Sequence, residues 1–163
     1  MKLLIWGDRA RYERDVPTWV SQLPLEQVYC PRERPLESML PEHADAQGLF
    51  VDAIAPVDRA LLDRLPRLKL IHSEGVAYNT IDLEAARERG IYVCNNKGCN
   101  ASSTAEMAVM LMLMVLRYGV VGDRAVREGK QIHFKERTMA AGAPELGECS
   151  VGLVGFGDIA QAT

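Results

Sequence analysis

Short apolar runs rich in β-branched residues recur along the first part of this 163-residue chain. Their starts lie about 20 to 25 residues apart, which leaves room for one helix between successive strands. Strands that alternate with helices pair in parallel through right-handed crossovers. Because the runs are apolar almost throughout, we expect a sheet that is covered on both faces. The runs are Leu3–Trp6, Val28–Cys30, Leu49–Val51, Leu68–His72 and Ile91–Cys94.

The segments between these runs carry helix signals. Val57 to Leu65 places its apolar residues on one helix face, and Pro66 closes it. Asp82 to Arg89 begins at a residue type that caps helices and stops before Gly90, which can take the left-handed conformation of a helix end. Residues 1–98 are therefore predicted to form a doubly wound α/β domain with a parallel sheet in flavodoxin-like order. Weaker helix candidates are Val16–Leu23 and Pro35–Leu40.

A long apolar helix is predicted to follow this domain. Ser103 and Glu106 match a capping box, in which both side chains satisfy backbone amides at the start of a helix. The next stretch, Met107–Leu116, is apolar on all sides of a helix and contains four of the seven methionines. Such a helix must be buried between layers or between subunits, and its methionines are typical of adaptable packing.

The helical character continues beyond this stretch. A second helix is predicted over Val120–Glu128, with Gly129 as its terminator, whereas residues 130–147 look irregular. We therefore expect residues 99–147 to form a helical linker and dimerisation arm. Because so apolar a surface is rarely left exposed, we expect a homodimer formed through residues 101–130.

A glycine-rich turn lies at the end of the chain. Cys149–Val154 has a strand pattern and leads into G-x-G-x-x-A, where Gly155 permits a tight turn and Gly157 lets a pyrophosphate approach the backbone. Ala160 lets the following helix pack closely. Residues 148–163 are therefore predicted to begin a dinucleotide-binding Rossmann domain. Because the neighbours of that strand are missing here, we expect it to join another sheet edge, to pair with a dimer mate or to be disordered.

Charge and composition exclude several classes of protein. The net charge is −3, without a basic block and with few aromatic residues, so we expect no nucleic-acid partner. The longest apolar run is shorter than the roughly 20 residues of a membrane span, so we expect no membrane association. No secretory signal follows Met1, and a zinc site on Cys94 and Cys99 would lack a second ligand pair. We therefore expect a cytoplasmic protein with reduced thiols and no metal.

Several strings, in the right order, resemble the D-isomer-specific 2-hydroxyacid dehydrogenases, including the phosphoglycerate dehydrogenase-like members. The resemblance covers the chain from about residue 45 onwards. In that family a flavodoxin-like substrate domain flanks an inserted nucleotide-binding domain, and a long helix links the two and helps to form the dimer. The matching strings are Leu68–Ile71, Gly75–Asp82, Ala85–Val93, Ser103–Glu106, Arg124–Lys130 and Val151–Ala160.

The resemblance implies a set of binding residues. Backbone amides near Gly75 and Val76 would hold the carboxylate of a small 2-hydroxy or 2-keto acid, and Ala77 stands in the same loop where many members have glycine. Thr104 would lie near the nicotinamide of NAD or NADP. The residues implied to bind the pyrophosphate of the cofactor are Gly155, Phe156, Gly157, Asp158 and Ile159.

No catalytic residue is predicted within this chain. The family's catalytic Arg, Glu and His come later, and none of His43, His72 and His133 stands in a matching context. Hydride transfer needs a bound cofactor, a cation that polarises the carbonyl and a proton donor. We therefore expect the N-terminal part of an NAD- or NADP-dependent oxidoreductase, truncated, inactive alone and weak at best in cofactor binding. The alternative interpretation is a non-catalytic, dimeric α/β interaction module.

Overall fold

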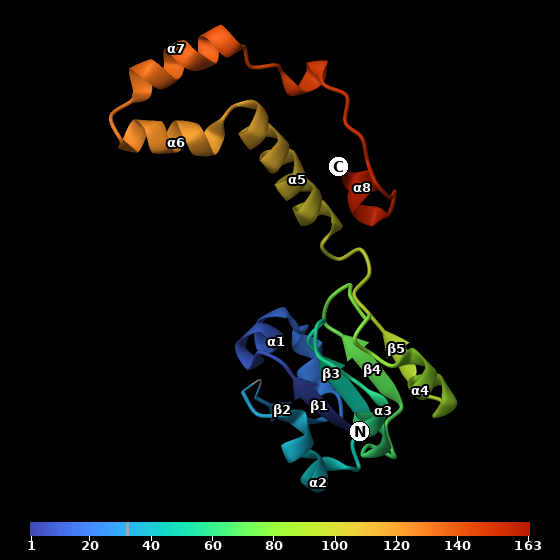
Figure 1. The fold of residues 1–163 in the computed structure, drawn as a ribbon. Coiled ribbons are helices and arrows are strands. Elements are labelled where there is room, and N and C mark those ends of the chain that lie inside the picture. The colour runs from blue at the N-terminus through green and yellow to red at the C-terminus, as the bar shows by residue number, and fades with distance from the viewer. Residues whose placement is uncertain (32) are drawn as a thin grey trace. The chain divides into compact units, whose positions relative to one another are not determined.

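The computed structural model describes residues 1–31 and 33–163. The chain forms two compact units, Met1–Lys97 and Gly98–Thr163. The first unit contains the β-sheet, and the second is helical (Figure 1). The division follows the last strand closely, so every strand of the described residues belongs to the first unit.

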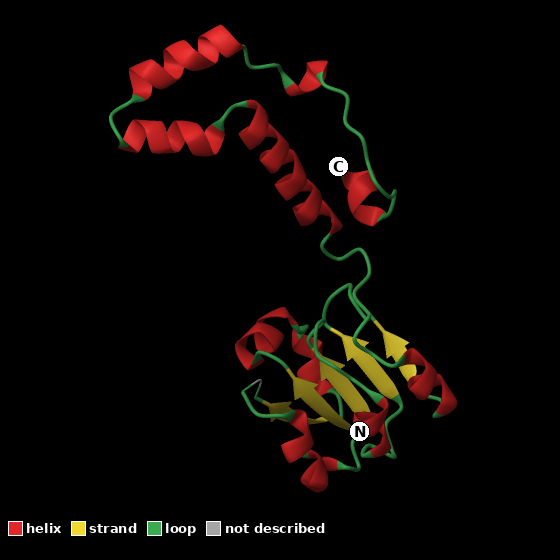
Figure 2. Cartoon of the chain, in the orientation of Figure 1, coloured by secondary structure: helices red, strands yellow, loops and turns green. Residues whose placement is uncertain are grey.

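A parallel sheet, with five strands in the described residues, forms the centre of the first unit (Figure 2). Its order is β2-β1-β3-β4-β5, which confirms the flavodoxin-like order predicted from the spacing of the apolar runs. Because all strands run in the same direction, their carboxyl ends lie at one edge, and the loops that follow them gather there. The strands are β1 (Lys2–Trp6), β2 (Glu26–Cys30), β3 (Gly48–Val51), β4 (Leu70–Ser73) and β5 (Tyr92–Cys94).

The two faces of this sheet are packed differently. On one face Leu4, Leu49 and Ile71 lie in register on three neighbouring strands and are fully buried. The same cluster contains leucines from the connecting segments. On the other face Phe50 contacts Tyr12 edge-on, with ring centroids 5.2 Å apart, and stacks on His72 at 5.3 Å. Adjacent strand residues point to opposite faces, which is why Leu49 and Phe50 belong to different clusters.

Aspartate side chains begin the main helices of the first unit. Asp8, Asp58 and Asp82 each accept a hydrogen bond from the amide three residues later, which satisfies a donor that has no partner inside the helix. The prediction of a helix ending before Gly90 is confirmed, and Gly90 has a φ of +65°. These helices are α1 (Arg9–Asp15), α2 (Leu40–His43), α3 (Arg59–Asp63) and α4 (Leu83–Glu88), with short 3-10 helices at Thr18–Gln22 and Leu36–Ser38.

Helices make up most of the second unit. Helix α5 packs against α6 and α8, and α6 packs against α7. Among the described residues of this unit, only Ala105 is buried, so the apolar side chains of α5 are largely half-buried or exposed. The helices are α5 (Ala101–Leu116), α6 (Gly119–Arg127), α7 (Gln131–Ala141) and α8 (Asp158–Ala162), with a 3-10 helix at Leu146–Glu148.

Two sequence predictions about the helices of this unit are wrong. The capping box is not formed, because α5 begins two residues before Ser103 and the Ser103 hydroxyl donates to the Asn100 carbonyl at 3.1 Å. The stretch predicted to be irregular contains α7, whose Phe134 packs closely against Gly122 of α6. A Cβ atom at Gly122 would lie 3.1 Å from that ring, so tertiary contact supports a helix that lacks an apolar stripe of its own.

The predicted strand Cys149–Val154 is also wrong, because these residues belong to no sheet of the structure. A strand needs neighbours for its N–H and C=O groups, and residues 150–154 have no strand beside them in the described chain. Their side chains are exposed, and Val154 is fully so.

No single helix among the described residues is long and apolar enough to cross a membrane. Helices α5 and α6, with a bend of 59° between them, reach the necessary length and composition only when taken together.

Candidate functional site

The loop that follows β4 lies at the carboxyl edge of the sheet and contains the three residues predicted to bind a substrate carboxylate. Gly75, Val76 and Ala77 are consecutive in this loop, Gly75 half-buried and the other two exposed. Ser73, at the end of β4, is buried completely. The loop therefore starts from a buried residue, and its exposed residues Val76 and Ala77 are accessible to solvent.

Four successive carbonyl groups of this loop accept hydrogen bonds from within the unit. The carbonyls of Glu74 and Val76 accept from the side-chain amides of Asn96 and Asn95, at 3.0 and 2.7 Å. The carbonyl of Gly75 accepts from the backbone amide of Asn96 at 2.9 Å. The Ser73 hydroxyl donates to the carbonyl of Ala77 at 2.7 Å. Every peptide oxygen from residue 74 to residue 77 thus has a donor.

Unlike its carbonyls, most backbone amides of this loop have no hydrogen-bond partner within the described residues. The N–H of Glu74 donates to the carbonyl of Val51, at 2.8 Å. Within the described residues, the N–H groups of Gly75, Val76 and Ala77 have no acceptor. Three consecutive free N–H groups on an accessible loop can bind an anion such as a carboxylate.

Gly75 is required by close packing. A Cβ atom at this position would lie 2.7 Å from the Cβ of Ala53, in the loop after β3, which is closer than two carbon atoms can approach. Ala77, by contrast, stands where many members of the resembling family have glycine. Its φ is not positive, so the backbone here accommodates a side chain.

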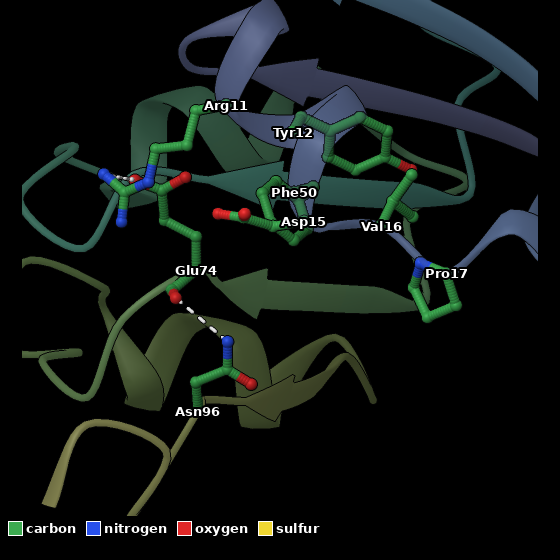
Figure 3. Close-up of a pocket in the computed structure, with 8 residues that line it drawn as sticks. All are labelled: Arg11, Tyr12, Asp15, Val16, Pro17, Phe50, Glu74 and Asn96. Carbon is green, nitrogen blue, oxygen red and sulfur yellow. Dashed lines mark hydrogen bonds and ion pairs between the residues drawn. The ribbon is translucent and has the colours of Figure 1, made fainter. Parts of the chain in front are cut away.

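An ion pair links this loop to α1. The Arg11 guanidinium lies 3.1 Å from the Glu74 carboxylate, whose side chain is only 9% exposed. Both residues line a cavity of about 280 Å³ between α1, Phe50 and Asn96, into which Asp15 also points (Figure 3). Arg11, Glu74 and Asp15 were not predicted as site residues, because α1 was not predicted. The signal for α1 was Asp8, two residues after the first apolar run, at a helix N-cap position.

The second unit contains the residues predicted to bind the cofactor. Thr104 lies half-buried in the first turn of α5, and the glycine turn leads into α8, which packs against α5. Gly155 has a φ of +91°, a conformation that favours glycine and agrees with a tight turn. Around Gly157 a Cβ atom would meet nothing within 4 Å, so the space beside its backbone is open.

The start of α8 carries a negative charge and exposed apolar side chains. Asp158, at the first position of α8, has its carboxylate 3.7 Å from the position that a Cβ atom on Gly98 would take. A negative charge at a helix N-terminus competes with a phosphate for the same amides. Phe156 is 73% exposed, and Ile159 is exposed as well. The contacts of Gly155, Phe156, Gly157, Asp158 and Ile159 with a dinucleotide therefore stay a prediction.

None of the three histidines lies in either predicted binding segment. His72 stacks on Phe50 in the aromatic cluster, and burial lowers its pKa below the usual value of 6.5. His43 ends α2, and His133 is exposed on α7.

A doubly wound α/β unit with free amides at the carboxyl edge of its sheet belongs to the class of proteins that bind ligands outside the carboxyl ends of parallel strands. The particular family is shown by sequence. The chain belongs to the D-isomer specific 2-hydroxyacid dehydrogenases, whose catalytic domain matches residues 14–158.

Individual relatives agree with this assignment. The glyoxylate reductase of Pyrococcus furiosus is 32% identical over 99% of this chain and 49% of its own length. The NAD-dependent formate dehydrogenase of Staphylococcus aureus, solved in complex with NAD, is 27% identical with a TM-score of 0.65, over 80% of this chain and 41% of that one. D-2-hydroxyisocaproate dehydrogenase shares the fold, with a TM-score of 0.77 at 22% identity over 99% of this chain and 48% of that one. The chain thus spans about half the length of the relatives that it matches.

Proposed function

We propose that this chain is the N-terminal part of an NAD- or NADP-dependent D-2-hydroxyacid dehydrogenase, and that its first unit holds the carboxylate of a small 2-hydroxy or 2-keto acid. The observation that carries the proposal is the set of free amides on Gly75, Val76 and Ala77. Hydrogen bonds from backbone N–H groups to a carboxylate are strengthened by its charge, and three donors can serve both of its oxygens.

Binding of glyoxylate, the smallest 2-keto acid, tests this proposal. In NMR titrations of the full chain, the amide signals of Gly75, Val76 and Ala77 should shift with one common dissociation constant. Glycolaldehyde, which lacks the carboxylate, should leave them unchanged. Shifts confined to other residues, or equal shifts with both compounds, would remove the support for this site.

We also propose that these residues by themselves bind NADH weakly and do not transfer hydride. The exposed glycine turn and the carboxylate of Asp158 support this proposal. No increase in NADH fluorescence on mixing is expected at micromolar protein, and no loss of NADH on adding glyoxylate. Turnover at an ordinary enzymatic rate would contradict it.

A second candidate function is a dimeric interaction module, favoured by the apolar surface of α5. The side chains of Met107, Leu111 and Val115 are 51%, 52% and 75% exposed. Beside them lies an apolar groove of about 480 Å³, bounded by α5 and residues 146–151. An exposed apolar surface of this kind is typical of a protein–protein interface.

The homodimer that we propose forms through residues 101–130. Sedimentation at micromolar concentration should report a dimer, and Leu111→Glu should shift it towards monomer, because a charge would be buried at the interface. A wild-type protein that stays monomeric would contradict this candidate and leave the carboxylate site unaffected.

A further inference from the structure

We propose that Asn95 and Asn96 are positioning residues that aim the free amides of the Gly75–Ala77 loop at the carboxylate of the ligand. This inference rests on the proposed function, because it assumes that these amides bind a carboxylate. It adds two side chains, from a different loop, that touch no ligand and act through the backbone.

The geometry of the peptide group couples each carbonyl of this loop to the next N–H. In a planar trans peptide the C=O and the following N–H point in opposite directions. The carbonyls of Glu74, Gly75 and Val76 therefore belong to the same rigid groups as the N–H bonds of the next three residues. A hydrogen bond that fixes one of these oxygens therefore also fixes the direction of the N–H bond in the same peptide group.

All three oxygens are held from the loop after β5. Asn96 holds two of them, with its side-chain amide on Glu74 and its backbone amide on Gly75. Asn95 holds the third, with its side chain on Val76. Each of the three donors is consequently fixed in its orientation, which a flexible loop would not maintain. Preorganised donors cost less entropy on binding than donors that must first be ordered.

The two asparagines do not contribute equally. The bond from the Asn96 backbone to Gly75 survives substitution of the Asn96 side chain by leucine, so the peptide before Val76 stays in place. The peptides before Gly75 and Ala77 each depend on one side chain, and the bond from Asn95 is the shorter of the two, at 2.7 Å against 3.0 Å from Asn96. Ser73 secures the next peptide, and its hydroxyl is buried in the core. Asn95 should therefore be the more sensitive position for a test, and Ser73 is less suitable because its loss would also disturb packing.

Substitution by leucine, which has the shape of asparagine without its donor, separates orientation from bulk. Asn95→Leu and Asn96→Leu should each weaken glyoxylate binding about fivefold, the effect of one lost hydrogen bond, with Asn95 the larger of the two. Asn100→Leu is the matched control, because Asn100 is exposed and its side chain makes no capping hydrogen bond. This control should bind glyoxylate like the wild type.

A second readout needs no ligand. In ¹⁵N relaxation measurements on the full chain, the amides of Gly75, Val76 and Ala77 should be ordered in the wild type and in Asn100→Leu. In Asn95→Leu these three amides should become more mobile. The amides of β4 and β5 should stay as ordered as in the wild type. Loop amides that stay equally ordered, or glyoxylate affinities unchanged in both variants, would overturn the positioning role. If the wild type binds no glyoxylate but Asn95→Leu loosens the loop, the asparagines order the loop, whereas the proposed function fails and with it the aim at a carboxylate.

Discussion

The two units of this chain use their apolar residues in opposite ways. In the first unit, a parallel sheet lets connected segments bury leucines such as Leu4, Leu49 and Leu62 almost completely. In the second unit, α5 is more uniformly apolar, yet Leu113 remains 41% exposed. The comparison teaches that apolar content alone does not make a core, because burial needs a second layer to pack against.

The two units also differ in how the N-termini of their helices are capped. Three helices of the first unit begin at an aspartate whose side chain accepts from the first turn. In the described part of the second unit, α5, α6, α7 and α8 begin without such a side-chain hydrogen bond. The first unit therefore satisfies its helix termini locally, whereas the second leaves these donors to solvent or to a partner.

The largest effect should come from truncating the sheet core. Leu49→Ala removes a fully buried side chain from the central strand and should lower the free energy of unfolding by about 2–5 kcal/mol. Leu113→Ala, on α5, should cost less than about 1 kcal/mol in the monomer. Urea denaturation at low protein concentration measures both. Equal losses would mean that α5 is as well packed as the sheet.

The next effect concerns the close approach beneath the candidate carboxylate loop. Gly75→Ala should destabilise the first unit by about 1–3 kcal/mol, because its Cβ would overlap that of Ala53. The double variant Ala53→Gly/Gly75→Ala should recover much of the loss, less the cost of about 0.5–1 kcal/mol for a new glycine. Thermal unfolding compares the two, and a double variant no more stable than Gly75→Ala would show that another contact is responsible.

Helix caps should give a smaller difference between the units. Asp82→Ala removes a hydrogen bond of 2.8 Å to the amide of Ala85 and should cost about 1 kcal/mol. Asn100→Ala, at the start of α5, should change the stability by less than about 0.5 kcal/mol, since its side chain makes no such bond. Urea midpoints of the two variants decide the point. A larger loss at Asn100 would contradict the contrast in capping.

The smallest effect should be a pH dependence confined to the first unit. Burial lowers the pKa of His72 below its usual 6.5, so the folded state binds its proton less readily than the unfolded state. Stability from this group is complete above about pH 6.5 and declines as the pH falls below that value. His72→Phe should keep the stacking on Phe50 and flatten the decline in urea midpoints between about pH 7 and pH 5. An unchanged slope would assign the decline to other groups.

The carboxylate of Asp45 titrates in a lower range than His72. The hydrogen bond from Lys2 lowers the pKa of Asp45 below its usual value of 3.8. The stability that this pair contributes is therefore lost only at pH values below the window used for His72.

Local patterns predicted the elements whose environment is uniform along their length. The strands were recognisable because a parallel sheet buries both faces and selects continuous apolar runs. Helix α4 was recognisable because Asp82 and Gly90 mark its two ends. Both kinds of signal are contained within about ten residues, so they survive without knowledge of the rest of the fold.

Elements that depend on distant partners were missed or misplaced. Helix α1 is a charged segment whose one buried residue is Tyr12. It therefore has no apolar stripe from which a helix could be predicted. Helix α7 likewise depends on a contact with another helix, because its Phe134 packs against α6. The strand expected at Cys149–Val154 has the right residues but no neighbouring strand to pair with. In each case the deciding contact is made outside the segment.

The candidate carboxylate site also combines features that the sequence predicted with features that depend on distant contacts. The five strands and the position of Gly75–Ala77 after the fourth of them could be predicted from the sequence, and the structure confirms the flavodoxin-like order expected for them. Only the tertiary structure decided which way the peptides of that loop face, because their carbonyls accept from Asn95 and Asn96, 19 and 22 residues away from their partners. A hydrogen bond across that separation exists only when two neighbouring strands have brought both loops to one edge of the sheet.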